Sequence, residues 1–154
     1  DRYESFGALK GLEFQKDLEK TSFYAGGRTQ KAPAQRLVDF VDGRLSTDLN
    51  STSYQPGLNS APLHSLLPKI IGSRLRKGFA AFGEKMHGYY TNEANIIGVE
   101  SRTSSPINIP RKENLEHTDI DGLFPCGEGG GYAGGIVSAA MDGERCAEAA
   151  IAKF

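Results

Sequence analysis

Six glycines fall within nine residues near the end of the sequence, and the acidic Glu128 lies among them. Glycine permits left-handed backbone and lets a ligand contact the main chain. A helix that begins after such a loop presents N–H groups without intrahelical acceptors. Their positive partial charge suits phosphate or another electron-rich oxygen. A carboxylate just before the loop can accept hydrogen bonds from ligand hydroxyls, as with a ribose. Residues 123–140 therefore favour a ligand site.

The same residues also permit a plainer interpretation, in which the glycines only connect a strand to a helix. The segment differs from the dinucleotide fingerprint, where an acidic residue follows GxGxxG by about twenty positions, because the chain nearly ends there. Two features favour the ligand site. The pair Gly127-Glu128 precedes the loop, and the small side chains of Ala139, Ala140 and Ala147 allow the next helix to pack closely on a sheet.

A second candidate group surrounds Arg102, which lies in a run of hydroxyl side chains. A guanidinium group binds carboxylate or phosphate in a bidentate manner, so Arg102, Thr103 and Ser104 could face an anionic ligand. The alternative is a surface arginine in a polar turn. Substituting Arg102 by Ala in the whole enzyme is expected to impair turnover.

Other groups exclude several classes of function. The three histidines are isolated, so no metal site is assigned. No GxSxG elbow is present, which argues against a hydrolase. Cys126 has no CxxC partner and is predicted to be a small buried side chain. Residues 74–77 are interpreted as a solvated helix face, and a formal net charge of −1 indicates no nucleic-acid partner. No apolar run is long enough to span a membrane, and two cysteines fit a reducing compartment, so the predicted location is cytoplasmic.

The elements that must position these groups can be read from apolar spacing. Helices are predicted over residues 11–25, from Pro33 to Gly43, over 63–71 and over 75–86, with a loop over 46–61. Apolar runs at 96–99, 107–109 and 122–125 predict strands, and a small-residue helix is predicted over 134–152. The predicted fold class is α+β, with a helical first half followed by a small sheet and a long C-terminal helix.

Several motifs resemble those of a bacterial family of uncharacterised FAD-dependent dehydrogenases within the two-domain flavoprotein superfamily. The matching segments are Gly-Val-Glu-Ser-Arg-Thr-Ser-Ser-Pro at 98–106, Pro-Cys-Gly-Glu at 125–128, Gly-Tyr-Ala-Gly-Gly-Ile at 131–136, Ala-Pro-Ala-Gln-Arg at 32–36 and Ser-Tyr-Gln-Pro-Gly at 53–57. The resemblance implies an incomplete part of an FAD/NAD(P)-binding flavoprotein fold. It divides the chain into a substrate-side segment, 1–92, and a C-terminal FAD-binding segment, 93–154.

The resemblance also implies roles for individual residues. In that superfamily the acidic residue binds the ribityl chain, and the following helix points its N-terminus at the flavin pyrimidine ring. The implied cofactor-binding residues are Gly127, Glu128, Gly131, Tyr132, Ala133, Gly134, Gly135 and Ile136. The implied substrate-side candidates are Arg102, Thr103, Ser104, Gln35, Arg36 and Tyr54, for an unknown small molecule. For the last three, a structural role in helix surface or loop packing is the alternative.

One departure from the family pattern shapes the functional hypothesis. Such flavoproteins hold the ADP half of FAD with an N-terminal βαβ unit carrying its own GxGxxG, and this chain contains no such unit. The hypothesis is therefore the C-terminal part of an FAD-dependent oxidoreductase, partnered by an N-terminal dinucleotide-binding segment of the same protein. Alone, the chain is expected to bind FAD weakly or not at all and to be inactive. The competing hypothesis is a helical interaction module whose glycine loop is structural.

Overall fold

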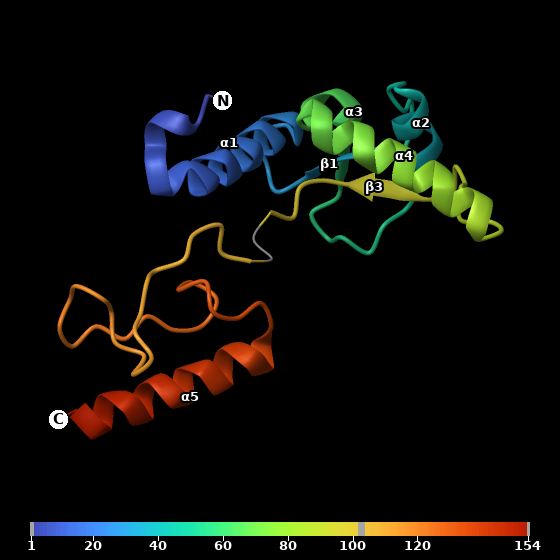
Figure 1. Ribbon diagram of the computed structural model, residues 1–154. Coiled ribbons are helices and arrows are strands. Elements are labelled where there is room, and N and C mark those ends of the chain that lie inside the picture. The colour runs from blue at the N-terminus through green and yellow to red at the C-terminus, as the bar shows by residue number, and fades with distance from the viewer. Residues whose placement is uncertain (1, 102–103, 154) are drawn as a thin grey trace. The chain divides into compact units, whose positions relative to one another are not determined.

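The computed structural model describes residues 2–101 and 104–153 and has an α+β fold, which confirms the predicted class. The chain divides into two compact units. The sheet unit comprises Asp17–Val99, and the loop unit comprises Asp1–Lys16 together with Glu100–Phe154. The division falls within helix α1, Lys10–Ala25, which follows a short 3-10 helix at Glu4–Leu9. Figure 1 shows the elements of both units along the chain.

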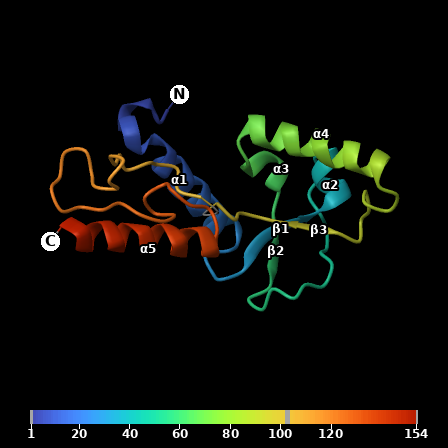
Figure 2. The same ribbon diagram turned by 60° about the horizontal axis from the view of Figure 1, so that its bottom comes forward.

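The sheet unit is built on three short strands in the order β2-β1-β3. The central strand β1, Ala32–Arg36, pairs parallel with β2, Leu58–Ser60, and antiparallel with β3, Asn95–Ile97. Three helices contact this sheet or one another: α2, Leu37–Asp42, α3, Leu63–Leu66, and α4, Lys69–Lys85. Figure 2 shows them together on one side of the strands. The core beneath them consists of Ala34, Leu37, Phe40, Ala61 and Leu63.

The helix predicted to begin at Pro33 begins instead at Leu37, so that prediction is wrong. Pro33, Ala34 and Gln35 are buried strand residues, and Arg36 has extended backbone (φ −63°, ψ 145°) before α2. The residue before a proline avoids helical backbone, which favours extended chain at Ala32. Ala34 matches a helical stripe only by coincidence. The predicted end is confirmed, because Gly43 takes the left-handed backbone of a C-cap (φ 76°) and its N–H bonds to Asp39 and Phe40.

The remaining helices follow their patterns closely. Helix α1 ends at Ala25, as predicted. Pro68 interrupts the predicted helix 63–71 and separates α3 from α4, and α4 continues through residues 72–74 without a break. Of the predicted strands, only the one beginning at Ile96 forms part of the sheet. Residues 107–109 and 122–125 are not strands, and residues 58–60, predicted to be loop, are one.

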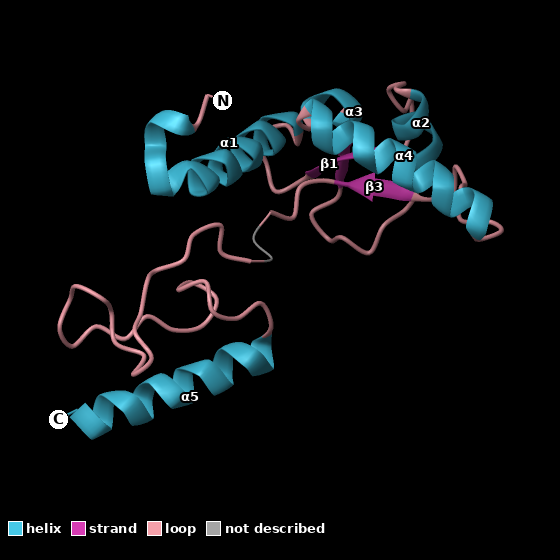
Figure 3. Ribbon diagram, viewed as in Figure 1, coloured by secondary structure: helices cyan, strands magenta, loops and turns pink. Residues whose placement is uncertain are grey.

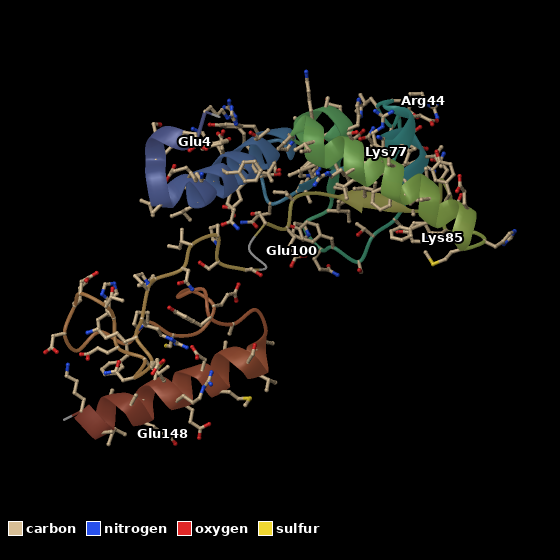
Figure 4. All side chains as sticks on the ribbon, in the orientation of Figure 1. Glu4, Arg44, Lys77, Lys85, Glu100 and Glu148 are labelled. Atoms are coloured by element: carbon tan, nitrogen blue, oxygen red, sulfur yellow. The ribbon has the colours of Figure 1, made fainter. Side chains whose placement is uncertain are left out.

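The loop unit contains one long helix, α5, Ile136–Lys153, which the sequence predicted over 134–152. Figure 3 shows that the chain between β3 and α5 is drawn as loop wherever it is described. An isolated bridge between Arg111 and His117 is the exception to its irregular backbone. One side of α5 carries the buried Asp142 and Cys146, and Figure 4 places Glu148 on the side away from the loops. Among the described residues, no helix is both long and apolar enough to cross a bilayer.

Candidate functional site

The glycine loop packs against the segment that begins at Ser104. Ile109 N–H donates to the Gly130 oxygen at 3.0 Å, and the Asn108 side-chain amide donates to the Gly131 oxygen at 3.2 Å. The Ser105 hydroxyl lies 3.4 Å from the Gly129 oxygen. Residues 107–109 therefore pair with the loop backbone rather than with a strand, which explains why their alternating pattern did not produce one.

The loop itself is closed by its own backbone. Gly131 N–H donates to the Glu128 oxygen at 2.9 Å, and Tyr132 N–H donates to the Gly127 oxygen at 3.0 Å. Gly131 has left-handed backbone (φ 84°), and a Cβ there would lie 2.6 Å from the Ile107 oxygen. Only glycine meets both conditions without displacing the neighbouring segment. Part of the glycine content thus serves packing rather than ligand access.

A pocket opens where Ser104 and Ser105 face the last residues before α5. Its volume is about 310 Å³, and it is lined by Ser104, Ser105, Gly131, Tyr132, Ala133 and Gly134. The structure therefore brings one predicted substrate-side residue, Ser104, together with four of the predicted cofactor-binding residues. Ser105 completes the lining, and only its place beside Ser104 in the sequence motif could have pointed to it.

The N-terminus of α5 adjoins this pocket through the chain itself, because Gly134 lines the pocket and α5 begins at Ile136. The first turn of a helix offers N–H groups without intrahelical acceptors. The N–H of Gly135 is engaged with the Ser138 hydroxyl at 3.2 Å. A Cβ at position 134 would lie 3.7 Å from the Ser104 hydroxyl, in ordinary van der Waals contact, so a larger side chain there would occupy part of the pocket.

The other four predicted cofactor-binding residues lie outside the pocket lining: Gly127, Glu128, Gly135 and Ile136. Glu128 is exposed on the turn that precedes Gly131, and Gly127 is buried against α5. Arg102 and Thr103 lie outside the described residues, so their predicted roles stay predictions. Cys126 is exposed, and the prediction of a buried side chain is wrong for it; the buried cysteine is Cys146 on α5.

The remaining substrate-side candidates lie in the sheet unit, where their side chains already have partners. Gln35 is fully buried; it donates to the Arg44 oxygen, accepts from the His64 N–H at 3.2 Å and contacts the His64 ring nitrogen at 2.8 Å. Arg36 is held by an ion pair with Asp48 at 2.8 Å and by two backbone oxygens. The exposed Tyr54 donates its hydroxyl to the Gln30 oxygen at 2.8 Å.

Sequence reasoning missed the charged pair that lies beneath the glycine loop. Arg111 and Asp142 form a two-point ion pair at 2.8 and 2.9 Å, and their side chains are only 9% and 2% exposed. The hydrogen bond from Arg111 holds the pKa of Asp142 well below its usual range. No local spacing in the sequence connects Asp142 to Arg111, which lies 31 residues away.

A glycine loop at a helix N-terminus, with a hydroxyl-lined pocket beside it, is compatible with the class of proteins that bind an anionic or electron-rich ligand group. Comparison with known proteins narrows this class. Residues 1–103 match the family described as FAD-dependent protein, C-terminal domain-like, and the chain belongs to that family. The matched region ends before the glycine loop, so the assignment does not depend on the loop motif.

A relative from Clostridium beijerinckii, described as an uncharacterized protein, is 40% identical over 154 residues. The alignment covers 99% of this chain and 29% of the relative. The chain thus spans less than a third of the length of that protein. Because the identity extends to the whole chain, the likeness includes the glycine loop and α5 as well as the family-matched region.

Proposed function

We propose that this chain forms the isoalloxazine and ribityl side of the FAD site in an FAD-dependent oxidoreductase. The observation that carries the proposal is the pocket where Ser104 and Ser105 meet residues 131–134 at the N-terminus of α5. Membership in an FAD-dependent family supports it independently. FAD, when bound, supplies the hydride-accepting chemistry, while the protein positions the cofactor and tunes it.

The size of the pocket supports a site for part of FAD. Its volume of about 310 Å³ lies at the lower end of the range for small-molecule sites, roughly 300–1,000 Å³. That space suits one ring system and not a complete dinucleotide. In this proposal the ADP half is held by an N-terminal dinucleotide-binding segment of the same protein.

The proposed residue roles follow from chemistry and position. The exposed Glu128 accepts hydrogen bonds from ribityl hydroxyls. Backbone N–H groups at Gly134 and Ile136 stabilise negative charge near the flavin N1–C2=O edge, which raises its hydride affinity. Arg102, Thr103 and Ser104 form the substrate side. Because Gln35 and Arg36 are engaged within the sheet unit, their proposed role is to hold that unit in shape rather than to contact substrate.

The outer face of α5 supports the proposed N-terminal partner segment. Ile136, Val137, Met141 and Ile151 are between 59% and 92% exposed. A row of large apolar side chains on one helix face is typical of a surface that packs against other protein. A cytoplasmic location belongs to the same proposal, because free thiols persist in a reducing compartment.

The test is the visible absorption spectrum of the protein expressed from its complete reading frame. A flavin spectrum that is released on denaturation as non-covalent FAD is the expected result. Gly134→Val should reduce flavin content, because its side chain enters the pocket beside Ser104. Gly129→Val is the matched control, because a Cβ at that position meets nothing within 4 Å. Equal flavin content in the two variants would remove this pocket from the proposal.

The exposed face of α5 also favours the second candidate, an interaction module without redox chemistry. In that case the glycine loop only connects the preceding segment to α5. The same experiment separates the two candidates. A colourless full-length protein that also takes up no added FAD would favour the interaction module.

A further inference from the structure

Arg111 lies between an aromatic ring and a carboxylate inside the loop unit. The centre of its guanidinium group is 3.6 Å from the centroid of the Tyr132 ring. Its two terminal nitrogens bond to the two carboxylate oxygens of Asp142 at 2.9 and 2.8 Å. A planar guanidinium group satisfies both contacts at once, because it can stack on a ring and form a parallel pair of hydrogen bonds in its own plane.

Asp142 connects this arginine to the glycine loop. One carboxylate oxygen also accepts the Gly127 N–H at 2.9 Å, and the other accepts from Arg145 at 3.0 Å. Together with the two bonds from Arg111, these use the full acceptor capacity of the carboxylate. Arg111 additionally donates to the Pro125 oxygen at 2.8 Å. The start of the loop, from Pro125 to Gly127, is therefore fixed to α5 through one ion pair.

The other end of the loop depends on the same arginine. Tyr132 lines the pocket, and its hydroxyl donates to the Ile109 oxygen at 2.7 Å. That bond fixes the far edge of the ring, and the Arg111 guanidinium group covers one face. The orientation of this pocket wall is thus determined by Arg111 on one side and by the backbone at Ile109 on the other.

We propose that Arg111 is a positioning residue of the flavin site, which holds Tyr132 and the glycine loop in the conformation that receives the cofactor. The inference rests on the proposed function, because it concerns the same pocket. Arg111 itself does not line the pocket and acts through Tyr132 and Asp142. A lysine in its place would keep the charge but would lose both the planar stack and the paired hydrogen bonds.

The first part of the test needs no cofactor. Amide hydrogen exchange is measured on the FAD-free full-length protein with Arg111→Lys and with Arg145→Lys as the matched control. Both substitutions remove an arginine partner of Asp142, but Arg145 is 64% exposed and does not stack on Tyr132. Arg111→Lys should accelerate exchange at Gly127 and Tyr132, while β1 and α4 keep their wild-type rates. Uniform acceleration along the chain would overturn the proposal in favour of a general stabilising role.

The second part measures FAD affinity by titration. Arg111→Lys is expected to weaken FAD binding roughly tenfold or more, as for the loss of hydrogen bonds between charged groups, and Arg145→Lys to change it less than about twofold. In a Tyr132→Leu background the effect of Arg111→Lys should shrink markedly, because the arginine acts through that ring. Equal affinities for Arg111→Lys and the wild type would overturn the proposal.

The two parts keep this proposal separate from the proposed function. If the wild-type protein takes up no FAD, the proposed function fails on that result alone. Localised exchange at Gly127 and Tyr132 in Arg111→Lys would then still support control of the pocket wall by Arg111. If the wild type binds FAD and the exchange of the loop does not change, the positioning role is contradicted and the flavin site is kept.

Discussion

Each of the two units is stabilised internally by a different kind of interaction. In the sheet unit, the largest fully buried side chains are Phe40, Leu63 and the uncharged Gln35. In the loop unit, the buried side chains include the carboxylates Asp142 and Glu116, which pair with Arg111 and Lys153. Apolar packing tolerates changes of pH and salt, whereas a buried ion pair depends on both partners and on their protonation. The unit that carries the candidate site is therefore the more sensitive of the two to conditions.

The largest expected effect tests the apolar half of this comparison. Phe40 is fully buried and contacts Phe79 edge to face, with the ring centroids 5.9 Å apart. Phe40→Ala should destabilise the sheet unit by about 3–5 kcal/mol, through lost burial and the cavity left behind. Denaturant unfolding, monitored by amide hydrogen exchange in β1 and α2, measures this loss of stability. Phe82→Ala is the control, because Phe82 is 46% exposed; a similar loss there would mean that the core has been wrongly located.

The next largest effect tests the contribution of the buried ion pair to the stability of the loop unit. Asp142→Asn should destabilise the loop unit by roughly 2–3 kcal/mol at pH 7, because the Arg111 guanidinium group loses its buried anion. The hydrogen bond from Arg111 lowers the pKa of Asp142. The ionised carboxylate therefore stabilises the fold fully when pH is above the ordinary pKa of an aspartate, and this stabilisation is lost as pH falls below that value. The stabilities of wild type and variant should therefore converge in acid. A constant difference at every pH would show that packing, not charge, is responsible.

A smaller effect on stability is expected at the C-terminal end of α5, where Lys153 pairs with Glu116. Hydrogen bonds from Lys153 and from the Gly122 N–H lower the pKa of Glu116 from 4.5 to about 2. Its stabilising contribution is therefore complete above pH 4.5 and is lost between pH 4.5 and about 2. Glu116→Gln should flatten the melting temperature against pH in that window. The exposed Glu113→Gln should leave the profile unchanged, and the same flattening in both variants would contradict the assignment.

The smallest expected effect concerns the sheet unit again. Burial and the nearby Arg76 lower the pKa of His64 below 6.5. The fold therefore favours the neutral imidazole, and stability falls slightly as pH drops below 6.5. Arg76→Gln should raise the pKa of His64, as measured by NMR titration of the ring. Lys77→Gln is the control on the exposed face of α4, where Figure 4 shows Lys77; an equal rise there would exclude a specific effect of Arg76.

The comparison also explains which helices and strands could be predicted from the sequence. Helices α1, α4 and α5 were predicted because a helical period is a local property of the chain. Strand β1 was missed because Ala34 falls at helical spacing with Leu37 and Val41, and the switch from strand to helix at Arg36 carries no period of its own. The segment 107–109 alternates like a strand, but its hydrogen-bonding partner is the glycine loop.

The candidate site was predictable only in part for the same reason. The glycine loop and Ser104 belong to contiguous motifs, and the structure brings them to one pocket. Arg111 and Asp142 are far apart in sequence, and either alone resembles an ordinary surface charge. Their pairing arises only when the irregular chain before α5 folds back along the helix, which no periodic pattern in the sequence encodes.

The exposed face of α5 has a practical consequence for handling the chain by itself. An exposed apolar strip runs along α5, formed by side chains that are each more than half exposed: Ile136, Val137, Met141 and Ile151. At rising concentration, copies of the chain can shield these strips from water only by associating with one another. Light scattering should therefore increase with concentration, and Val137→Lys should suppress that increase. Purification at high dilution, or with a mild detergent that coats the strip, is the corresponding choice at the bench.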